Sequence, residues 1–177
     1  MENLYLELAR NRQSCRDFND KELSSQTVRK IAELATLSPS ACNSQPWKMF
    51  LVTGEKVELV TKSLQNRGRN PFLDKAKAYI VITEKQAKLN EFVSSRFNRD
   101  HFVKYDIGQL TAYITLAAQS LEVSSCIIGW INQEELRSAV GYPENEESNI
   151  VVALGYSDIE VREKNRKDFD EVIEEIK

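Results

Sequence analysis

The chain has 177 residues, of which 41% are hydrophobic and 29% charged, and its net charge at pH 7 is -3. This length and composition are typical of one globular domain with its own core. The basic excess that nucleic-acid binding requires is missing, the N-terminal segment lacks the apolar stretch of a secretory signal, and no apolar run approaches the roughly 20 residues of a membrane helix. We therefore expect a cytoplasmic protein that binds neither nucleic acid nor a membrane.

The first half of the chain predicts helices and strands in alternation. Apolar residues four apart indicate a short amphipathic helix from Glu2 to Asn11. Ser24 is suited to cap a second helix, which must end by Ser38 because a proline follows. The apolar run 47–53 predicts a buried strand, and the pattern of 56–65 predicts a helix after the turn. The order of elements is therefore helix, helix, strand, helix.

The second half continues this alternation and ends in a charged segment. Asp106 is suited to cap a long helix that carries small apolar residues on its buried side. Gly141 is expected to end a shorter helix. The segment 159–177 has no core of its own and looks like an extended arm that ends in a helix. The remaining predicted elements are strands at 79–83, 126–131 and 149–154, a polar helical region at 86–99, and a helix at 134–140.

Several common chemistries are disfavoured by the residue counts. The three cysteines, Cys15, Cys42 and Cys126, are odd in number and far apart, which indicates free thiols rather than disulfides. The single histidine, His101, disfavours a histidine-based triad or a multi-histidine metal site, and we expect no bound metal. Six glycines occur without a G-x-G-x-x-G or P-loop pattern. A phosphate group, if one is bound, must therefore be held by side chains.

The segment 12–16, with the sequence RQSCR, is suited to that task. Guanidinium groups such as those of Arg12 and Arg16 match phosphate oxygens with a planar fork and stay charged at any working pH. Ser14 adds a hydroxyl between them. For so short a pattern alone, solvated surface charges are the commoner explanation. A second motif at residues 38–47, SPSACNSQPW, makes the combination more specific.

These two motifs, in this order, resemble the signature of the nitroreductase family of FMN-dependent oxidoreductases. The resemblance covers most of the chain and implies an α+β fold with a central mixed β-sheet flanked by helices in three layers. It also implies a single domain over residues 1–177 that forms a homodimer, with the arm 159–177 lying on the partner subunit. Two FMN sites at the dimer interface follow from the same likeness.

The resemblance also assigns roles to individual residues. Arg16 would place a positive charge beside the flavin ring, which favours its reduced anionic form, so it is an electrostatic stabiliser rather than a nucleophile. Lys164 and Arg166 would reach the phosphate, although a solvated charge run fits them equally well. Asn70 matches a ring-contacting asparagine only loosely. The implied cofactor-binding residues are Arg12, Gln13, Ser14, Arg16, Pro39, Ser40, Ala41, Asn43, Gln45, Asn70, Ile128, Gly129, Lys164 and Arg166.

Two residues depart from the family pattern. Gln13 stands where relatives often carry a second cation, so one phosphate contact is replaced or lost. Glu122 stands at a helix end where glycine is common, and the chain between Thr83 and Asp106 is too short for a long insertion over the active site. These departures affect the expected substrate more than the expected cofactor.

The function implied is hydride transfer from NADH or NADPH to FMN, followed by reduction of a small-molecule acceptor such as a nitroaromatic or a quinone in a ping-pong cycle. One alternative keeps the flavin but changes the reaction, as in relatives that dehalogenate their substrate reductively. Another is a flavin-binding module without turnover, and a third is a structural dimer that has lost FMN.

Overall fold

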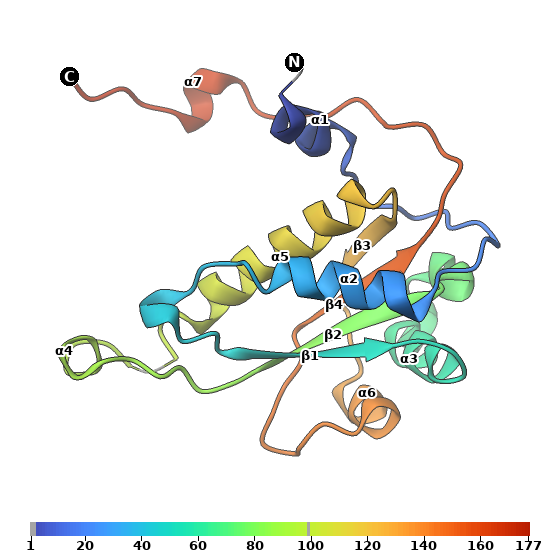
Figure 1. The fold of residues 1–177 in the computed structure, drawn as a ribbon, viewed down its shortest axis with the longest axis horizontal. Helices are drawn as coiled ribbons and strands as arrows, with labels where there is room; N and C mark the ends of the chain where they lie inside the picture. Colours follow the sequence, from blue (N-terminus) through green and yellow to red (C-terminus); the bar gives the residue numbers. More distant parts are fainter. Residues whose placement is uncertain (1–2, 99) are drawn as a thin grey trace.

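The computed structural model describes residues 3–98 and 100–177, and its centre is a four-stranded sheet (Figure 1). The strands are β1 (Trp47–Val52), β2 (Ala78–Glu84), β3 (Ser124–Ile128) and β4 (Ile150–Gly155), in the spatial order β1-β2-β4-β3. All three strand pairs are antiparallel. An isolated parallel bridge between Ser14 and Ser125 adds the first sequence motif to the edge of β3. The sheet is mixed through this bridge alone, because each neighbouring pair of strands runs in opposite directions.

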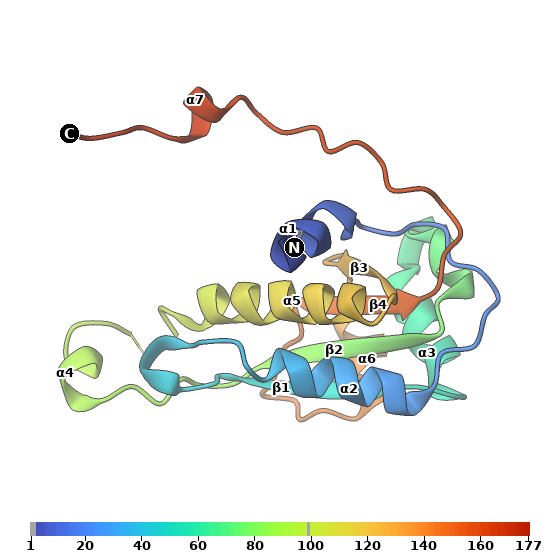
Figure 2. The same cartoon turned by 45° about the horizontal axis from the view of Figure 1, so that its top comes forward.

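Helices cover both faces of this sheet and make three layers (Figures 1 and 2). Helices α2 (Ser25–Ala35) and α5 (Val103–Ser120) pack on one face, where they meet Ile80 and Ile82 of β2. Helices α3 (Lys56–Leu64) and α6 (Gln133–Val140) cover the other face, against Tyr79 and Val81. Successive side chains of a strand point to opposite faces, so β2 needs apolar residues at consecutive positions, as it has from Ala78 to Ile82. The three-layer α+β fold expected from the sequence is confirmed.

Local signals set the ends of several helices as predicted. The Ser24 hydroxyl accepts a hydrogen bond from the Thr27 amide at 3.0 Å and begins α2. Gly141, with a φ of 84°, ends α6. The short elements are α1 (Leu4–Asn11), η1 (Ala41–Asn43), η2 (Asn66–Gly68), η3 (Pro71–Lys75), α4 (Glu91–Ser94) and α7 (Phe169–Val172).

Two predictions in the middle of the chain were wrong. Only α4 is helical within the expected helix at 86–99, because its aromatic residues face solvent and offer no stripe to pack on the core. Arg99, like Glu2 of the first predicted helix, lies outside the described residues. Asp106 is not a helix cap, since α5 begins at Val103. The Asp106 side chain is only 2% exposed and accepts a hydrogen bond from the Ala41 amide instead.

The last part of the chain forms an extended arm. It leaves β4, passes the segment that follows α1, and then stands clear of the body of the molecule (Figures 1 and 2). No residue from 156 to 177 is buried, and α7 is the only helix there. Residues 159–177 are extended apart from α7, and their apolar side chains, such as Phe169 and Ile176, are exposed.

Candidate functional site

The first motif lies along the edge of β3. The Cys15 amide donates a hydrogen bond to the Ser125 carbonyl at 2.9 Å, next to the bridge between Ser14 and Ser125. The Cys15 side chain is 1% exposed and belongs to the core. Because alternate residues of an extended segment face opposite ways, burial of Cys15 turns Ser14 and Arg16 outward.

The C-terminal arm meets this motif and completes a basic hollow. The Lys164 ammonium donates to the Arg12 carbonyl at 2.9 Å, and the Arg162 guanidinium donates to the Ser14 carbonyl at 2.8 Å. The hollow has a volume of about 330 Å³. It is lined by Arg12, Gln13, Ser14, Arg16, Arg162, Glu163, Lys164, Asn165 and Arg166.

The charges of this hollow are not balanced within the chain. Within residues 3–98 and 100–177, none of its four arginines and its one lysine forms an ion pair. Partial burial, together with the nearby charges of Arg12, Arg166 and Arg162, lowers the pKa of Lys164 below its ordinary value. A group of cations that repel one another is stabilised by an anion, and guanidinium forks are suited to phosphate.

The main chain is sparsely packed just after β3 ends. The Ile128 side chain is buried, so only its main chain can face a ligand. A methyl group at Gly129 would come no closer than 3.9 Å to its nearest neighbour, the Asn149 carbonyl oxygen. Trp130 is 45% exposed, and the Arg69 guanidinium lies 4.9 Å from its ring centre. The main chain at Gly129 therefore has open space beside it within the described residues, and an exposed aromatic residue follows it in the sequence.

Asn70 stabilises a turn in the loop that Trp130 contacts. It adopts a left-handed conformation with a φ of 50° at the start of η3, and its amide nitrogen donates to the Leu64 carbonyl at 2.9 Å. The neighbouring loop at Asn66 accepts a hydrogen bond from the Trp130 indole at 3.2 Å. Asn70 thus lies in the loop region that Trp130 touches, with its amide nitrogen occupied by the turn.

The second motif forms a strained loop. Cys42, Asn43 and Gln45 all have positive φ values, of 51°, 51° and 48°, a conformation that costs a residue with a side chain about 1 kcal/mol or more. Side chains hold this shape, because the Gln45 amide donates to the Ser40 hydroxyl at 2.9 Å and Asp106 accepts from the Ala41 amide at 3.0 Å. Strain held by several independent bonds is typical of functional loops.

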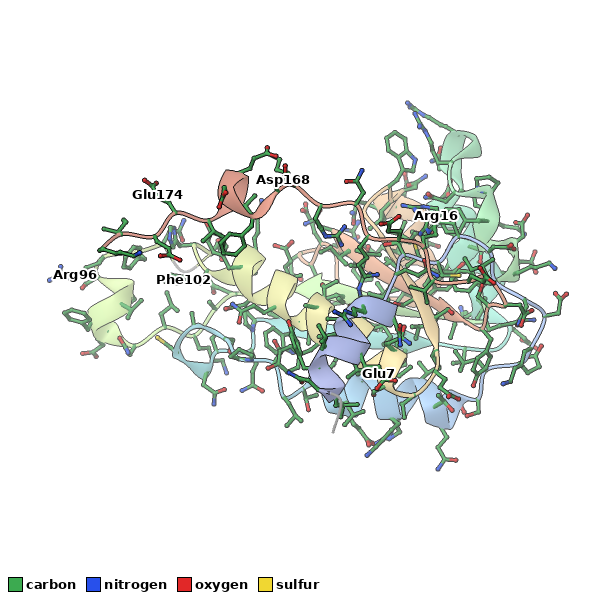
Figure 3. The ribbon with its side chains drawn as sticks, turned by 90° about the horizontal axis from the view of Figure 1, so that it is seen from above. Glu7, Arg16, Arg96, Phe102, Asp168 and Glu174 are labelled. Carbon is green, nitrogen blue, oxygen red and sulfur yellow. The ribbon has the colours of Figure 1, made fainter. Side chains whose placement is uncertain are left out.

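The two motifs lie at opposite ends of α5. The loop is tied to the first turn of this helix, whereas the first motif joins β3 just after the helix ends. A helix of 18 residues spans about 27 Å, and Figure 3 shows Arg16 and Phe102 far apart at its two ends. The structure brings together Arg12, Gln13, Ser14, Arg16, Lys164 and Arg166, with Ile128 and Gly129 further along β3. The other predicted residues lie in the loop at the start of α5, and they are Pro39, Ser40, Ala41, Asn43 and Gln45.

Two residues of the site were missed by sequence reasoning. Arg162 belongs to the basic run of the arm, yet nothing in the local pattern separated it from a solvated charge. Asp106 was interpreted as a helix cap, although its side chain positions the loop 39–45. Both act through contacts with residues that are far away in the sequence.

Comparison with known proteins decides the family. A family model described as Nitroreductase family matches residues 9–66 and 55–156. The chain belongs to the nitroreductase family. A protein of Archaeoglobus fulgidus that carries the provisional name NADH dehydrogenase/NAD(P)H nitroreductase is 34% identical over 93% of this chain and 88% of its own length.

Solved structures of family members share the fold. A nitroreductase family protein from Streptococcus pneumoniae TIGR4 has a TM-score of 0.84 and 22% identity, over 97% of this chain and 99% of that one. A nitroreductase with bound FMN from Desulfitobacterium hafniense DCB-2 has a TM-score of 0.71 and 21% identity, over 100% of both chains. The sequence motifs therefore identified the right family and fold.

Two features are absent from the described residues, 3–98 and 100–177. No helix there has the length and apolar character to cross a membrane. No three His, Cys, Asp or Glu side chains are grouped so that they could hold a metal ion.

Proposed function

We propose that this member of the nitroreductase family binds FMN, with the phosphate in the basic hollow and the ring near Gly129. Bound FMN supplies the hydride chemistry, accepting from NADH or NADPH and reducing a small-molecule acceptor such as a nitroaromatic or a quinone. The observation that carries this proposal is the basic hollow beside the end of β3, whose cations form no ion pair within the described residues. An anion site and open main chain at Gly129 lie along the same edge of the sheet.

The phosphate end has the chemistry that a flavin mononucleotide needs. The Ser14 hydroxyl and the cationic groups of Arg12, Lys164 and Arg166 line one hollow, so hydrogen bonds and charge both favour an oxyanion. Charged hydrogen bonds contribute about 1.5–3 kcal/mol each, compared with about 1 kcal/mol for neutral ones. A phosphate ester would therefore be held here more firmly than an uncharged ring.

The ring end supplies space and charge rather than a reacting group. Gly129 leaves room for a flat ring against the main chain, and Arg16 is exposed, with a guanidinium free of ion pairs in the described chain. A fixed positive charge beside the ring stabilises the negative charge that reduction brings. Because both substrates would meet the same exposed ring in turn, a ping-pong cycle follows.

A second copy of the chain would complete the site. One chain holds the two motifs at opposite ends of α5, a helix of 18 residues or about 27 Å, so a single FMN molecule would not contact both motifs of one chain. The surface of α1 and α5 exposes Leu4, Tyr5 and Tyr105, and the arm exposes apolar residues as well. We propose a homodimer in which the loop 39–45 of one subunit meets the first motif of the other, and the arm lies on the partner beyond the residues that bind its own first motif.

The experiment is to purify the protein, record its visible absorption spectrum and identify the extracted cofactor. We expect a flavin spectrum with FMN, or stoichiometric uptake of added FMN, and NAD(P)H oxidation when a quinone is supplied. A colourless protein that takes up no FMN would overturn the proposal. A yellow protein without turnover would leave only a flavin-binding module.

Two neighbouring variants refine this test. Arg16→Ala should weaken FMN binding and slow flavin reduction, because it removes a charge beside the ring. Ser14→Ala should do less, since a neutral hydrogen bond contributes only about 1 kcal/mol. Equal effects of the two variants would show that the charge of Arg16 has no special role.

A further inference from the structure

Gln13 joins the first motif to the C-terminal arm with both ends of its amide. Its side-chain oxygen accepts hydrogen bonds from the backbone amide of Arg162 at 3.2 Å and from the Arg162 Nε at 3.1 Å. Its side-chain nitrogen donates to the Glu160 carbonyl at 3.1 Å. A lysine or an arginine here could not accept these bonds and would repel Arg162. The departure from the family pattern at this position therefore has a structural consequence.

Arg162 is held at two points by these contacts. Besides the bond from its Nε to Gln13, its Nη2 donates to the Ser14 carbonyl at 2.8 Å. A planar guanidinium fixed at both points has one orientation, and its remaining N–H groups stay available for an anion. The hollow thus gains a cation from the arm in place of the one that position 13 lacks.

The docked arm has little else to hold it. None of its residues from 156 to 177 is buried, so apolar burial contributes little to docking within one chain. Its other bonds to the body are also polar. The Lys164 ammonium donates to the Arg12 carbonyl at 2.9 Å, the Ser157 hydroxyl donates to the Asp17 carbonyl at 2.6 Å, and Asn19 bonds to the Asp158 side chain at 2.9 Å and to the Tyr156 carbonyl at 2.8 Å. Segments held by exposed polar bonds open at low free-energy cost, so a ligand can shift them.

Docking also brings like charges together. When the arm lies on the motif, Arg162, Lys164 and Arg166 come beside Arg12 and Arg16 in the same hollow. Their mutual repulsion opposes docking, and a bound dianion removes it. The anion and the docked arm are therefore linked, and such linkage is reciprocal.

We propose that Gln13 is a positioning residue that clamps Arg162, so that the arm forms one wall of the anion site and the bound anion and docked arm stabilise each other. This inference rests on the proposed function for the identity of the anion as the phosphate of FMN. It adds Gln13 and Arg162 as the residues through which cofactor binding controls the arm.

The test measures hydrogen–deuterium exchange of the full chain over residues 157–166, alone and with inorganic phosphate, FMN or riboflavin. Phosphate and FMN should slow exchange there, whereas riboflavin, which lacks the phosphate, should not. Gln13→Ala should speed exchange in this segment and weaken FMN binding about tenfold, while riboflavin affinity stays within about twofold. Lys167→Ala, in the same arm but outside the hollow, is the matched control and should change neither quantity.

A second variant at position 13 distinguishes loss of the bond to Arg162 from a general loss of structure. Gln13→Glu loses the bond to the Glu160 carbonyl but keeps an oxygen that accepts from Arg162 and adds a negative charge. Because a charged pair with Arg162 is stronger than the lost neutral bond, the arm should be protected without any anion and phosphate should slow its exchange no further. FMN affinity should fall in this variant as well. Unchanged arm exchange and unchanged FMN affinity in Gln13→Ala would overturn the clamp, even in a protein that binds FMN. Protection of the arm by phosphate in a protein that takes up no FMN would support the clamp and contradict the proposed function.

Discussion

At the scale of single residues, packing requires glycine at position 155 but not at position 129. Gly155 lies so close to Phe18 that a methyl group built on it would be 2.8 Å from the Phe18 Cδ1 atom. Gly129 has no neighbour within 3.9 Å of such a methyl group. The fold itself therefore needs glycine at position 155 and not at position 129. A glycine that packing does not require is a candidate for contact with a ligand.

Gly129→Ala should leave the melting temperature unchanged and weaken FMN binding about tenfold or more, because an added methyl group would press against the ring. Thermal unfolding of the protein without cofactor and a fluorescence titration with FMN measure the two effects. Gly155→Ala is the control, and it should lower the melting temperature. If Gly129→Ala binds FMN as tightly as the unmodified protein, the ring does not lie over this strand end.

At the scale of secondary-structure elements, the C-terminal end of α5 contains a strained backbone conformation that a substitution can relieve. The Val123 amide donates to the Ala118 carbonyl at 2.9 Å and the Glu122 amide donates to the Gln119 carbonyl at 3.1 Å, which is the Schellman pattern of helix ends. This pattern places Glu122 in the left-handed region with a φ of 58°. Glycine adopts that conformation without strain.

Glu122→Gly should raise the free energy of unfolding by about 1 kcal/mol, because the left-handed conformation costs a residue with a side chain about 1–2 kcal/mol and the greater entropy of unfolded glycine offsets part of the gain. Chemical denaturation measures the change. Glu122→Ala removes the same carboxylate but keeps the strain, so it should bring no gain. Equal stabilisation by both variants would assign the effect to the charge instead.

A buried carboxylate at the end of β2 makes stability depend on pH. Glu146 is 5% exposed, accepts a hydrogen bond from the Thr83 hydroxyl at 2.7 Å and is paired with Lys85. Burial alone would raise the pKa of Glu146, but the bonds from Lys85 and Thr83 and the charges of Lys85 and Lys48 outweigh it, so the pKa is lowered. The stability that this group contributes is present above the ordinary glutamate pKa and is lost as pH falls through the lowered value.

We therefore expect the melting temperature to fall as the pH decreases below about 4.5. The fall should be less steep in Glu146→Gln, which has no carboxylate to protonate at this position. At neutral pH the same variant should be less stable by about 1–3 kcal/mol, since Lys85 loses its charged partner. Glu144→Gln, an exposed position in the same loop, should behave like the unmodified protein. Identical pH profiles for the two variants would remove Glu146 from this role.

At the scale of the whole molecule, the separation of the two motifs determines how a site can be assembled. One end of the chain offers cations and an open strand end, and the other offers a strained loop of small and amide side chains. Isologous pairing of two copies would bring each motif of one subunit to the other motif of its partner. The two sites of such a dimer would each contain residues of both chains.

Mixed dimers test this arrangement directly. Arg16→Ala and Asn43→Ala should each abolish most FMN-dependent NAD(P)H oxidation as separate homodimers. Co-expression with two different affinity tags yields dimers with one copy of each variant, in which one site carries both changes and the other carries none. We expect activity to return in these mixed dimers. If it does not return, the two motifs do not share a site across subunits.

The sequence predicted most of the fold because its signals are local. The Ser24 cap, the Gly141 end and the apolar strand at β2 depend on neighbouring residues, and each was confirmed. The region 86–99 was misjudged because only Ala87 and Leu89 reach the core, and no described residue from 90 to 98 is buried, so a longer helix would have no apolar face to bury. Asp106 was misjudged because an aspartate that accepts a hydrogen bond from a distant loop amide looks the same in sequence as an aspartate that caps a helix.

The sequence by itself determined the family, the alternation of helices and strands, and the residue types suited to a phosphate group. These follow from periodicity, capping chemistry and two short motifs, none of which needs a distant contact. Only the tertiary structure decided that Arg162 enters the basic hollow, that Gln13 holds it, and that the two motifs stand at opposite ends of α5. Hydrogen bonds between residues 13 and 162 leave no periodic trace in the chain, because folding alone brings them together.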